Sequence, residues 1–115
     1  MEANNNFIEN NSTQMRRGVL EYSILLILAL EDEYASSIIQ KLKDVDIIVA
    51  EGTVYPLLIR LKKLGLLNYR WEESPQGPPR KYYSITDIGR VKLKEQLDEW
   101  NSFYASVNKI LEKSI

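Results

Sequence analysis

Residues 51–89 read EGTVYPLLIRLKKLGLLNYRWEESPQGPPRKYYSITDIG, and this stretch decides the fold. Its first part predicts an amphipathic helix over residues 53–64, because apolar side chains recur there at helical spacing. The side chains predicted to face the core are Val54, Leu57, Leu58, Leu61 and Leu64. Residues 66–71 and 80–85 then alternate in the manner of strands, and a turn rich in Gly and Pro at residues 74–79 separates them.

A helix followed directly by a two-stranded hairpin with a basic tip is the layout of the recognition helix and wing in a winged helix-turn-helix. The predicted fold class is therefore mainly α with a small β-hairpin. We expect a flexible polar tail over residues 1–13, a winged helix-turn-helix DNA-binding domain over residues 14–86 and a long C-terminal dimerisation helix over residues 87–115. Upstream helices are predicted at about residues 15–30, apolar nearly all round and buried centrally, and at about residues 34–45.

Several local features follow from the residue types. By alternation, Leu67, Tyr69 and Trp71 share one face of their strand, and Lys81, Tyr83 and Ile85 share one face of the partner strand. The tip at residues 72–79 is expected to be too long for a two-residue turn and mobile, and residues 47–49 are expected to be a short extended segment. Thr86 is expected to cap the last helix. Ala50 cannot cap the helix at residues 53–64, so Glu51 or Thr53 is expected to do so, or the start is looser.

The same stretch resembles the PadR family of bacterial transcriptional regulators. The matching residues are Gly52-Thr53-Val54-Tyr55-Pro56, Arg60-Leu61, Leu64-Gly65-Leu66, Gly77-Pro78-Pro79-Arg80-Lys81-Tyr82-Tyr83, Thr86 and Gly89, with Trp100 further on. The resemblance covers roughly residues 16–113. It departs from the family pattern at Ala50, where many relatives carry Ser, and at Tyr34-Ala35, where many carry Tyr-Gly.

Composition argues against catalysis. The chain of 115 residues contains no Cys and no His, which removes thiolate chemistry and the commonest metal ligand and general base. No Gly-rich phosphate loop or hydrolase motif is present, so we predict no enzyme, no catalytic residues, no metal and no cofactor. The longest apolar run, Ile24 to Leu30, is far shorter than the ~18 residues of a membrane span, and the N-terminus does not read as a signal peptide. We therefore expect a cytoplasmic protein without a membrane partner.

Charge is distributed unevenly along the chain. Residues 1–59 carry −5, residues 60–94 carry +6 and residues 95–115 carry −2, which together give the net charge of −1. The positive charge thus lies in the predicted recognition helix and wing, and local fields rather than the total attract phosphates. A solvated charged face is the alternative interpretation of any such run.

The predicted DNA contacts come from three elements. Thr53 and Tyr55 stand at the leading end of the recognition helix, while Arg60 and Lys63 lie further back and suit phosphate contacts or salt bridges within the domain. The wing offers Arg80 and Lys81 for backbone or minor-groove contact, with Gln76 beside them. The helix over residues 34–45 would cross the DNA backbone and contribute Tyr34, Ser36 and Ser37.

The last helix is predicted to span roughly 27 residues, or about 40 Å, which is longer than a winged-helix body of about 25 Å. Its apolar residues follow a coiled-coil seam that would bury against a second copy: Leu93, Leu97, Trp100, Phe103, Tyr104, Val107, Ile110 and Leu111. The alternative is that the seam folds back on its own domain. The resemblance also implies dimerisation through this helix.

Trp100 is either an anchor of that interface or a ligand contact. The resemblance implies that a Trp at this place can line a pore between subunits and stack on flat, often cationic molecules. The predicted ligand-binding residues are Trp100, Leu97, Asp98 and Tyr104, and a flat aromatic or cationic small molecule is the candidate ligand.

The predicted function is a sequence-specific regulator of transcription that binds double-stranded operator DNA as a homodimer and acts as a ligand-responsive repressor. The alternative is a winged-helix protein-interaction module without DNA binding, which the acidic pI of about 5.5 favours.

Overall fold

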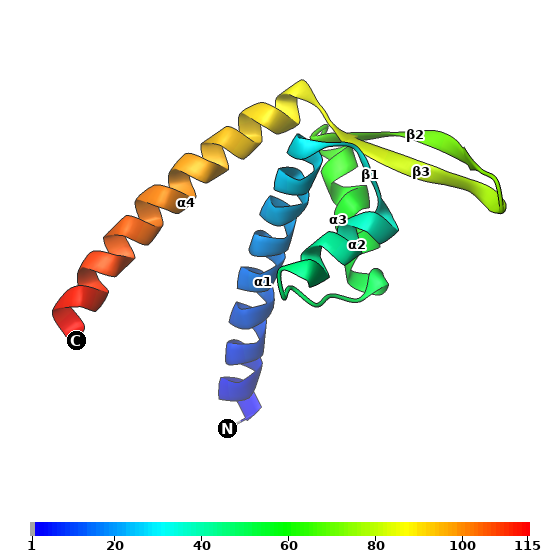
Figure 1. The fold of residues 1–115 in the computed structure, drawn as a ribbon. Helices are drawn as coiled ribbons and strands as arrows, with labels where there is room; N and C mark the ends of the chain where they lie inside the picture. The colour runs from blue at the N-terminus through cyan, green and yellow to red at the C-terminus, as the bar shows by residue number, and fades with distance from the viewer. Residues whose placement is uncertain (1) are drawn as a thin grey trace.

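The computed structural model describes the backbone of residues 2–115 and the side chains of residues 14–115 (Figure 1). Its elements in chain order are α1 (Glu2–Leu30), β1 (Glu33–Tyr34), α2 (Ala35–Asp44), α3 (Glu51–Lys63), β2 (Leu67–Ser74), β3 (Gly77–Ile85) and α4 (Asp87–Ser114). The strands form an antiparallel sheet in the order β1-β3-β2. The predicted fold class, mainly α with a small hairpin and a long C-terminal helix, is confirmed.

The core lies where α1, α2 and α3 meet beneath the base of the sheet. Its fully buried side chains are Leu20, Ile24, Leu25, Leu28, Ile38, Leu42, Val54, Leu58 and Leu61. Leu57 is also buried, so four of the five predicted core positions of α3 are correct. Leu64 is the exception, with 54% of its surface exposed. The helix ends at Lys63, and Leu64 is the C-cap residue, so helical periodicity no longer directs its side chain inward.

Helix α1 differs from its prediction in two ways. It begins at Glu2 rather than near Met15. Its burial is one-sided within the chain, because Leu26 is 39% and Leu30 is 85% exposed, so the prediction of a helix buried all round is wrong for these side chains. The flexible tail expected for residues 1–13 involves side chains outside the described part of the structure and stays a prediction.

The acidic segment after α1 contains an element that the sequence did not indicate. Residues Glu33 and Tyr34 pair with Tyr83 and Tyr82 to form β1, although Tyr34 was predicted to begin the helix over residues 34–45. Residues 47–49, by contrast, form no strand. Ile47 and Val49 pack against the core instead, so their apolar character reflects burial within a loop.

The hairpin has the predicted face pattern but a tighter tip. Leu67 pairs with Ile85, Tyr69 with Tyr83 and Trp71 with Lys81, so the two sets of residues that alternation grouped face each other across the ladder. Ser74 pairs with Gly77, so only Pro75 and Gln76 form the loop, and the prediction of a long tip over residues 72–79 is wrong. The register shifts beyond Glu72, where residues 78 and 79 of β3 oppose one residue of β2. A bulge of this kind accommodates prolines, which lack the N–H that a regular ladder needs.

The junction between the hairpin and α4 is closely fitted. The Thr86 hydroxyl accepts a hydrogen bond from the Gly89 amide at 3.0 Å and donates one to the Gly65 carbonyl at 2.6 Å. It thereby caps α4 as predicted and joins the helix to the turn before β2. A Cβ atom at Gly89 would lie 2.2 Å from the Leu66 carbonyl oxygen, so this position requires glycine. Gly65 itself has φ of 78°, in the left-handed region that favours glycine after a helix.

Beyond this junction α4 diverges from the rest of the chain (Figure 1). The radius of gyration is 16.9 Å, against about 13 Å expected for a compact domain of this length. The difference arises because α1 and α4 both project away from the three-helix core toward the same side, where the two termini lie. No helix among residues 2–115 is long and apolar enough to cross a membrane.

Candidate nucleic-acid interface

The exposed face of α3, the start of α2 and the hairpin surround a pocket of about 410 Å³. Its lining includes five of the residues predicted to contact DNA: Tyr34, Ser36, Tyr55, Arg80 and Lys81. The other lining residues are Ala35, Ile59, Trp71, Pro79 and Tyr83. Segments that are more than 40 positions apart in the chain thus converge on one solvent-open surface.

The start of α3 presents Tyr55 to that surface. Ala50 is the N-cap residue and makes no side-chain capping bond, so neither Glu51 nor Thr53 replaces it as a cap. The backbone carbonyl of Ala50 instead accepts the Thr53 amide at 3.0 Å and the Val54 amide at 3.3 Å. Val54 is buried while Tyr55 is 45% exposed, so the helix fixes the direction of Tyr55 by anchoring its neighbour.

Arg80 reaches toward β1 and the start of α2 rather than toward the tip. Its guanidinium carbon lies 4.2 Å above the ring centroid of Tyr34, and the Tyr34 ring lies 4.7 Å from the Tyr82 ring. Arg70 stacks on the other member of this pair, 4.4 Å above the Tyr82 ring. Two arginines and two tyrosines therefore form a continuous stack across one face of the sheet.

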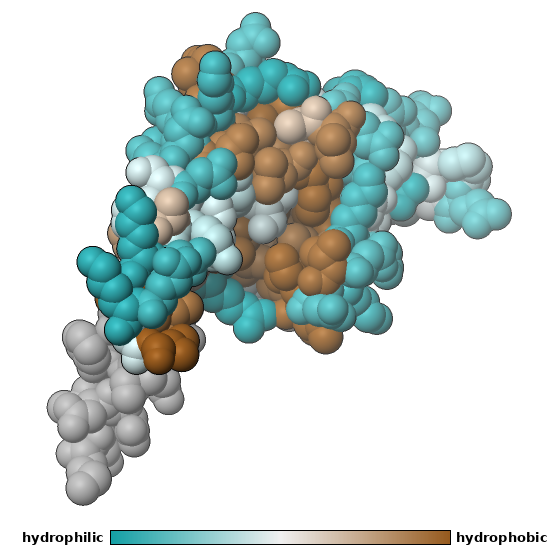
Figure 2. Space-filling view, turned by 60° about the vertical axis from the view of Figure 1, so that its left-hand side comes forward, coloured by the Kyte–Doolittle hydropathy of each residue, from teal (hydrophilic) through white to brown (hydrophobic). Residues whose placement is uncertain are grey.

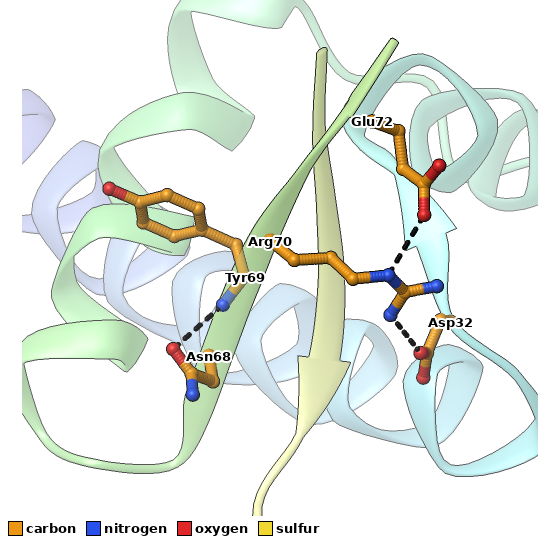
Figure 3. A network of polar contacts seen from close by, with 5 residues as sticks. All are labelled: Asp32, Asn68, Tyr69, Arg70 and Glu72. Carbon is orange, nitrogen blue, oxygen red and sulfur yellow. Dashed lines mark hydrogen bonds and ion pairs between the residues drawn. The ribbon is translucent and has the colours of Figure 1, made fainter. Parts of the chain in front are cut away.

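Arg70 is held by two carboxylates. Its Nη1 atom lies 3.0 Å from Asp32 and its Nε atom 2.8 Å from Glu72, as Figure 3 shows. The hydrogen bond to Asp32, followed by that to Glu72, raises the pKa of the Arg70 guanidinium above its ordinary value. The charge of Arg70 is consequently balanced within the domain, and this residue ties the hairpin to the segment that follows α1.

A second pocket, of about 270 Å³, adjoins the first and lies between the hairpin and the end of α3. It is lined by Ile59, Lys62, Lys63, Tyr69, Lys81 and Tyr83. Lys63 was a predicted DNA contact, whereas Lys62 was not. Because the core positions of this helix are Val54, Leu57, Leu58 and Leu61, helical spacing leaves Ile59 and Lys62 on its exposed side, so the sequence held a usable signal for both.

The remaining predicted contacts lie outside these pockets. Arg60 forms an ion pair with Glu21 of α1 at 2.6 Å, which is the domain salt bridge named as its alternative role. Thr53 and Gln76 are exposed, the first in the opening turn of α3 and the second in the hairpin loop, and Ser37 is half-buried.

Tyrosine hydroxyls near the interface are held in the neutral form. Burial raises the pKa of Tyr83 above its usual value, and the neighbouring Tyr55 and Tyr69 raise it further. Desolvation likewise raises the pKa of the half-buried Tyr82, with the carboxylates of Asp32 and Glu33 adding to the rise. At neutral pH these groups remain hydrogen-bond donors and add no negative charge to a surface that carries several cations.

The apolar seam of α4 is exposed along most of its length. Leu93 is the exception, at 8% exposure, because it belongs to the core of its own domain, and its contact with a second copy stays a prediction. The other seven seam residues are between 40% and 73% exposed: Leu97, Trp100, Phe103, Tyr104, Val107, Ile110 and Leu111. Figure 2 turns the side of the molecule on which α4 lies toward the viewer, and hydrophobic side chains gather over a broad area of that face.

Trp100 lies beside α1 of its own chain. Its ring is nearly parallel to that of Tyr22, with 6.2 Å between the centroids and 16° between the planes. The groove between the two helices has a volume of about 280 Å³ and is lined by Gly18, Tyr22, Gln96, Glu99, Trp100 and Phe103. The predicted ligand residues Leu97, Asp98 and Tyr104 do not line it. Among the described side chains, Gln96 Oε1 is a buried acceptor with no hydrogen-bond partner.

Three helices, a hairpin wing and a cationic surface between the wing and the third helix define a winged-helix protein. The chain belongs to the PadR-like family of transcriptional regulators, since the family described as "Transcriptional regulator PadR-like family" matches residues 24–95. Membership supports DNA-binding regulation as the function, and proteins of this class are in general not enzymes.

Solved structures of transcriptional regulators from several bacteria are similar to this chain over most of its length. A PadR-like transcription factor from Bacteroides fragilis is 54% identical, with a TM-score of 0.80 and 88% of this chain and 98% of that chain covered. A PadR-like transcriptional regulator from Bacillus cereus is 40% identical, with a TM-score of 0.75 and coverage of 85% and 96%. A PadR family transcriptional regulator from Eggerthella lenta is 32% identical, with a TM-score of 0.75 and coverage of 97% and 98%.

Proposed function

We propose that this protein is a sequence-specific, DNA-binding repressor that acts as a homodimer and is released by a small molecule. One observation carries the DNA-binding part of the proposal. Tyr55 at the start of α3, Ser36 at the start of α2, and Arg80 and Lys81 of the hairpin surround a single surface, although they come from three elements. A winged-helix protein places the third helix in the major groove and the wing on the adjacent backbone or minor groove.

The roles divide according to chemistry. Tyr55 is exposed near the leading end of α3 and is positioned to meet base edges or a phosphate. Arg80 and Lys81 supply charge from the wing, and charge contacts to phosphates are independent of sequence. Sequence preference would thus depend on α3, and most of the salt-dependent affinity on the hairpin and the end of α3.

Binding to promoter fragments over a range of salt concentrations tests this division. Replacing Arg80 and Lys81 with Ala should weaken binding to all sequences and reduce the salt slope by about 0.9 for each phosphate contact that is lost. The matched control replaces Lys109 and Lys113 with Ala. It removes the same amount of positive charge, but from the end of α4 that lies far from the hairpin (Figure 1). Unchanged affinity in the Arg80/Lys81 variant would refute the role of the wing. Absence of any salt-dependent binding by the wild-type protein would favour the protein-interaction module.

Dimerisation is proposed from the exposed seam of α4. Seven large apolar side chains of α4 remain between 40% and 73% exposed, although Trp100 stacks on Tyr22 of α1, and a two-fold copy would bury them. Replacing Val107 and Leu111 with Glu should yield monomers in sedimentation and weaken operator binding. The matched control replaces Ser102 and Ser106 with Glu. These residues lie away from the seam, and their replacement adds the same number of negative charges, so the dimer should stay intact. A stable dimer of the Val107/Leu111 variant would place the interface elsewhere.

A ligand site is proposed beside Trp100. The groove next to the parallel Tyr22 and Trp100 rings is partly apolar, and Glu99 provides a carboxylate, which suits a flat cation. Binding should quench the fluorescence of Trp100 in a Trp71→Phe background and lower operator affinity if the ligand prefers the dimer state that does not bind DNA. Equal dye binding by Trp100→Leu would leave Trp100 as a packing residue.

A further inference from the structure

Two lysines from distant parts of the chain meet on one aromatic ring. The Nζ atom of Lys62, in the last turn of α3, lies 5.2 Å from the ring centroid of Tyr69. The Nζ atom of Lys81, in β3, lies 4.6 Å from the same centroid and 5.6 Å from that of Trp71. Lys81 pairs directly with Trp71, which places it diagonally across the ladder from Tyr69. The sheet register and the end of α3 together fix this arrangement.

Lys62 and Lys81 lack the acidic partners that Arg60 and Arg70 possess. Within the part of the chain whose side chains are described, the ion pairs of α3 and the hairpin involve Arg60 and Arg70, and none involves Lys62 or Lys81. Figure 3 shows the Tyr69 ring and the Arg70 side chain leaving β2 on opposite sides. On one side of the hairpin, Arg70 is therefore paired with carboxylates, whereas on the other side the described residues give the Lys62 and Lys81 ammonium groups no ion pair.

The pocket at this place has the composition of an anion site. Three of its six lining residues are lysines, and none is acidic. An aromatic ring attracts an ammonium group, but it leaves the positive charge uncompensated and holds two like charges near each other. An anion in contact with both ammonium groups relieves that repulsion, and lysine is a common ligand of phosphate.

The pocket continues into the larger one beside the start of α3. Ile59, Lys81 and Tyr83 line both, so a single groove runs between α3 and the hairpin. A DNA strand that passes from the groove occupied by α3 to the wing would cross this place.

We infer that Lys62 and Lys81 together bind one phosphate of the DNA backbone above the ring of Tyr69. The inference rests on the proposed function and adds Lys62 to the residues that contact DNA. Lys81 lines both pockets, because it lies between the other wing residues and the end of α3. The ligand of this site is a phosphate group, and that group could belong to DNA or to a free phosphorylated molecule.

The salt dependence of operator binding distinguishes one shared phosphate from two separate ones. Each neutralised phosphate contributes about 0.9 to the slope of log affinity against log salt. If both lysines hold one phosphate, Lys62→Gln alone should change the slope little, and the Lys62→Gln/Lys81→Gln double variant should reduce it by about 0.9. Such a reduction means that affinity falls about 3.5-fold less between 50 and 200 mM salt. A loss of about 1.8 in the double variant, or no loss, would overturn the shared site.

The controls separate this inference from the proposed function. Wild-type binding with a steep salt slope tests the function, whereas the two Gln variants test the phosphate site alone. Lys109→Gln/Lys113→Gln removes the same charge from α4 and should leave the slope unchanged, and circular dichroism verifies that each variant is folded. Inorganic phosphate at matched ionic strength identifies the source of the phosphate. It should not saturably alter the fluorescence of Trp71 in a Trp100→Leu background; saturable binding that disappears in Lys62→Gln would assign the site to a free phosphorylated ligand and overturn the DNA assignment.

Discussion

Substitution of Gly89 by Ala tests the junction on which α4 is mounted. A Cβ atom here would lie 2.2 Å from the Leu66 carbonyl oxygen and 2.7 Å from a side-chain carbon of Ile85. The first contact involves the backbone of buried Leu66, immediately before β2, so relief requires that the helix or this segment move. Overpacking of this kind costs about 1–3 kcal/mol, whereas the helix propensity of Ala over Gly returns about 1 kcal/mol. Because the clash is with backbone, we expect a net loss of about 2 kcal/mol.

Urea denaturation followed by circular dichroism measures this loss. With a slope of about 2 kcal/mol per molar urea, the midpoint should fall by about 1 M. Gly18→Ala is the matched control, since Gly18 lies inside α1 and a Cβ atom there meets nothing within 4 Å. That variant should be neutral or more stable. All measurements require the same protein concentration, because association contributes to apparent stability. If Gly89→Ala is as stable as Gly18→Ala, the close approach is not a constraint.

Two further predictions concern polar groups in the same domain. Thr86→Ala removes the cap of α4 and leaves the Gly65 carbonyl without its hydroxyl donor, so it should cost about 0.5–2 kcal/mol in the same urea assay. Lys41→Met should lower stability at pH 7, and its difference from the wild type should shrink below about pH 4, since the hydrogen bond with Lys41 lowers the pKa of Glu31.

The sign of the second prediction follows from the two pKa shifts. Glu31 has a lowered pKa in the folded protein, so its contribution is present above the ordinary carboxyl range and is lost as pH falls through the lowered pKa. Hydrogen bonds with Glu33 and Glu31 raise the pKa of Lys41, and that contribution is lost only as pH rises through the raised pKa. A difference between Lys41→Met and the wild type that persists unchanged at pH 3 would contradict the ion-pair explanation. For Thr86, an unchanged urea midpoint would show that water replaces the cap without cost.

Periodicity predicted the elements that are long enough to repeat it. The spacing of Val54, Leu58 and Leu61 identified the buried face of α3, and alternation identified the pairing of Tyr69 with Tyr83. Two-residue β1 is too short to show alternation, and its sequence, Glu33-Tyr34, has no apolar pattern. The tight hairpin tip was missed because a run of Gly and Pro reads as a long loop, although a bulge can hold adjacent prolines within a strand.

Residue types in the sequence predicted which side chains belong to the candidate interface, but they did not predict which of those side chains form ion pairs within the domain. Sequence reasoning named Tyr55, Arg80 and Lys81, but it could not show that Arg60 meets Glu21, 39 residues away, while Lys62 meets no carboxylate among the side chains of residues 14–115. Whether a cation is neutralised depends on tertiary neighbours and not on its own segment. The surface that binds an anion is thus found by locating the charges that the fold leaves unpaired.

The mounting of α4 also governs distances far from it. The helix is fixed to the domain at its start through Thr86, Gly89 and Leu93, and it meets α1 once more where Trp100 stacks on Tyr22. The residues after Leu93 extend about 30 Å to Ser114 at ~1.5 Å per residue. Rotation by about 5° at the held end would displace the free end by nearly 3 Å, because displacement scales with the length of the arm. The direction of the helix therefore depends on the close contact of Gly89 with the Leu66 carbonyl. A small change at this contact causes a larger displacement at the C-terminal end of α4. The contact thus affects how accurately the C-terminal end of α4 is positioned relative to the wing.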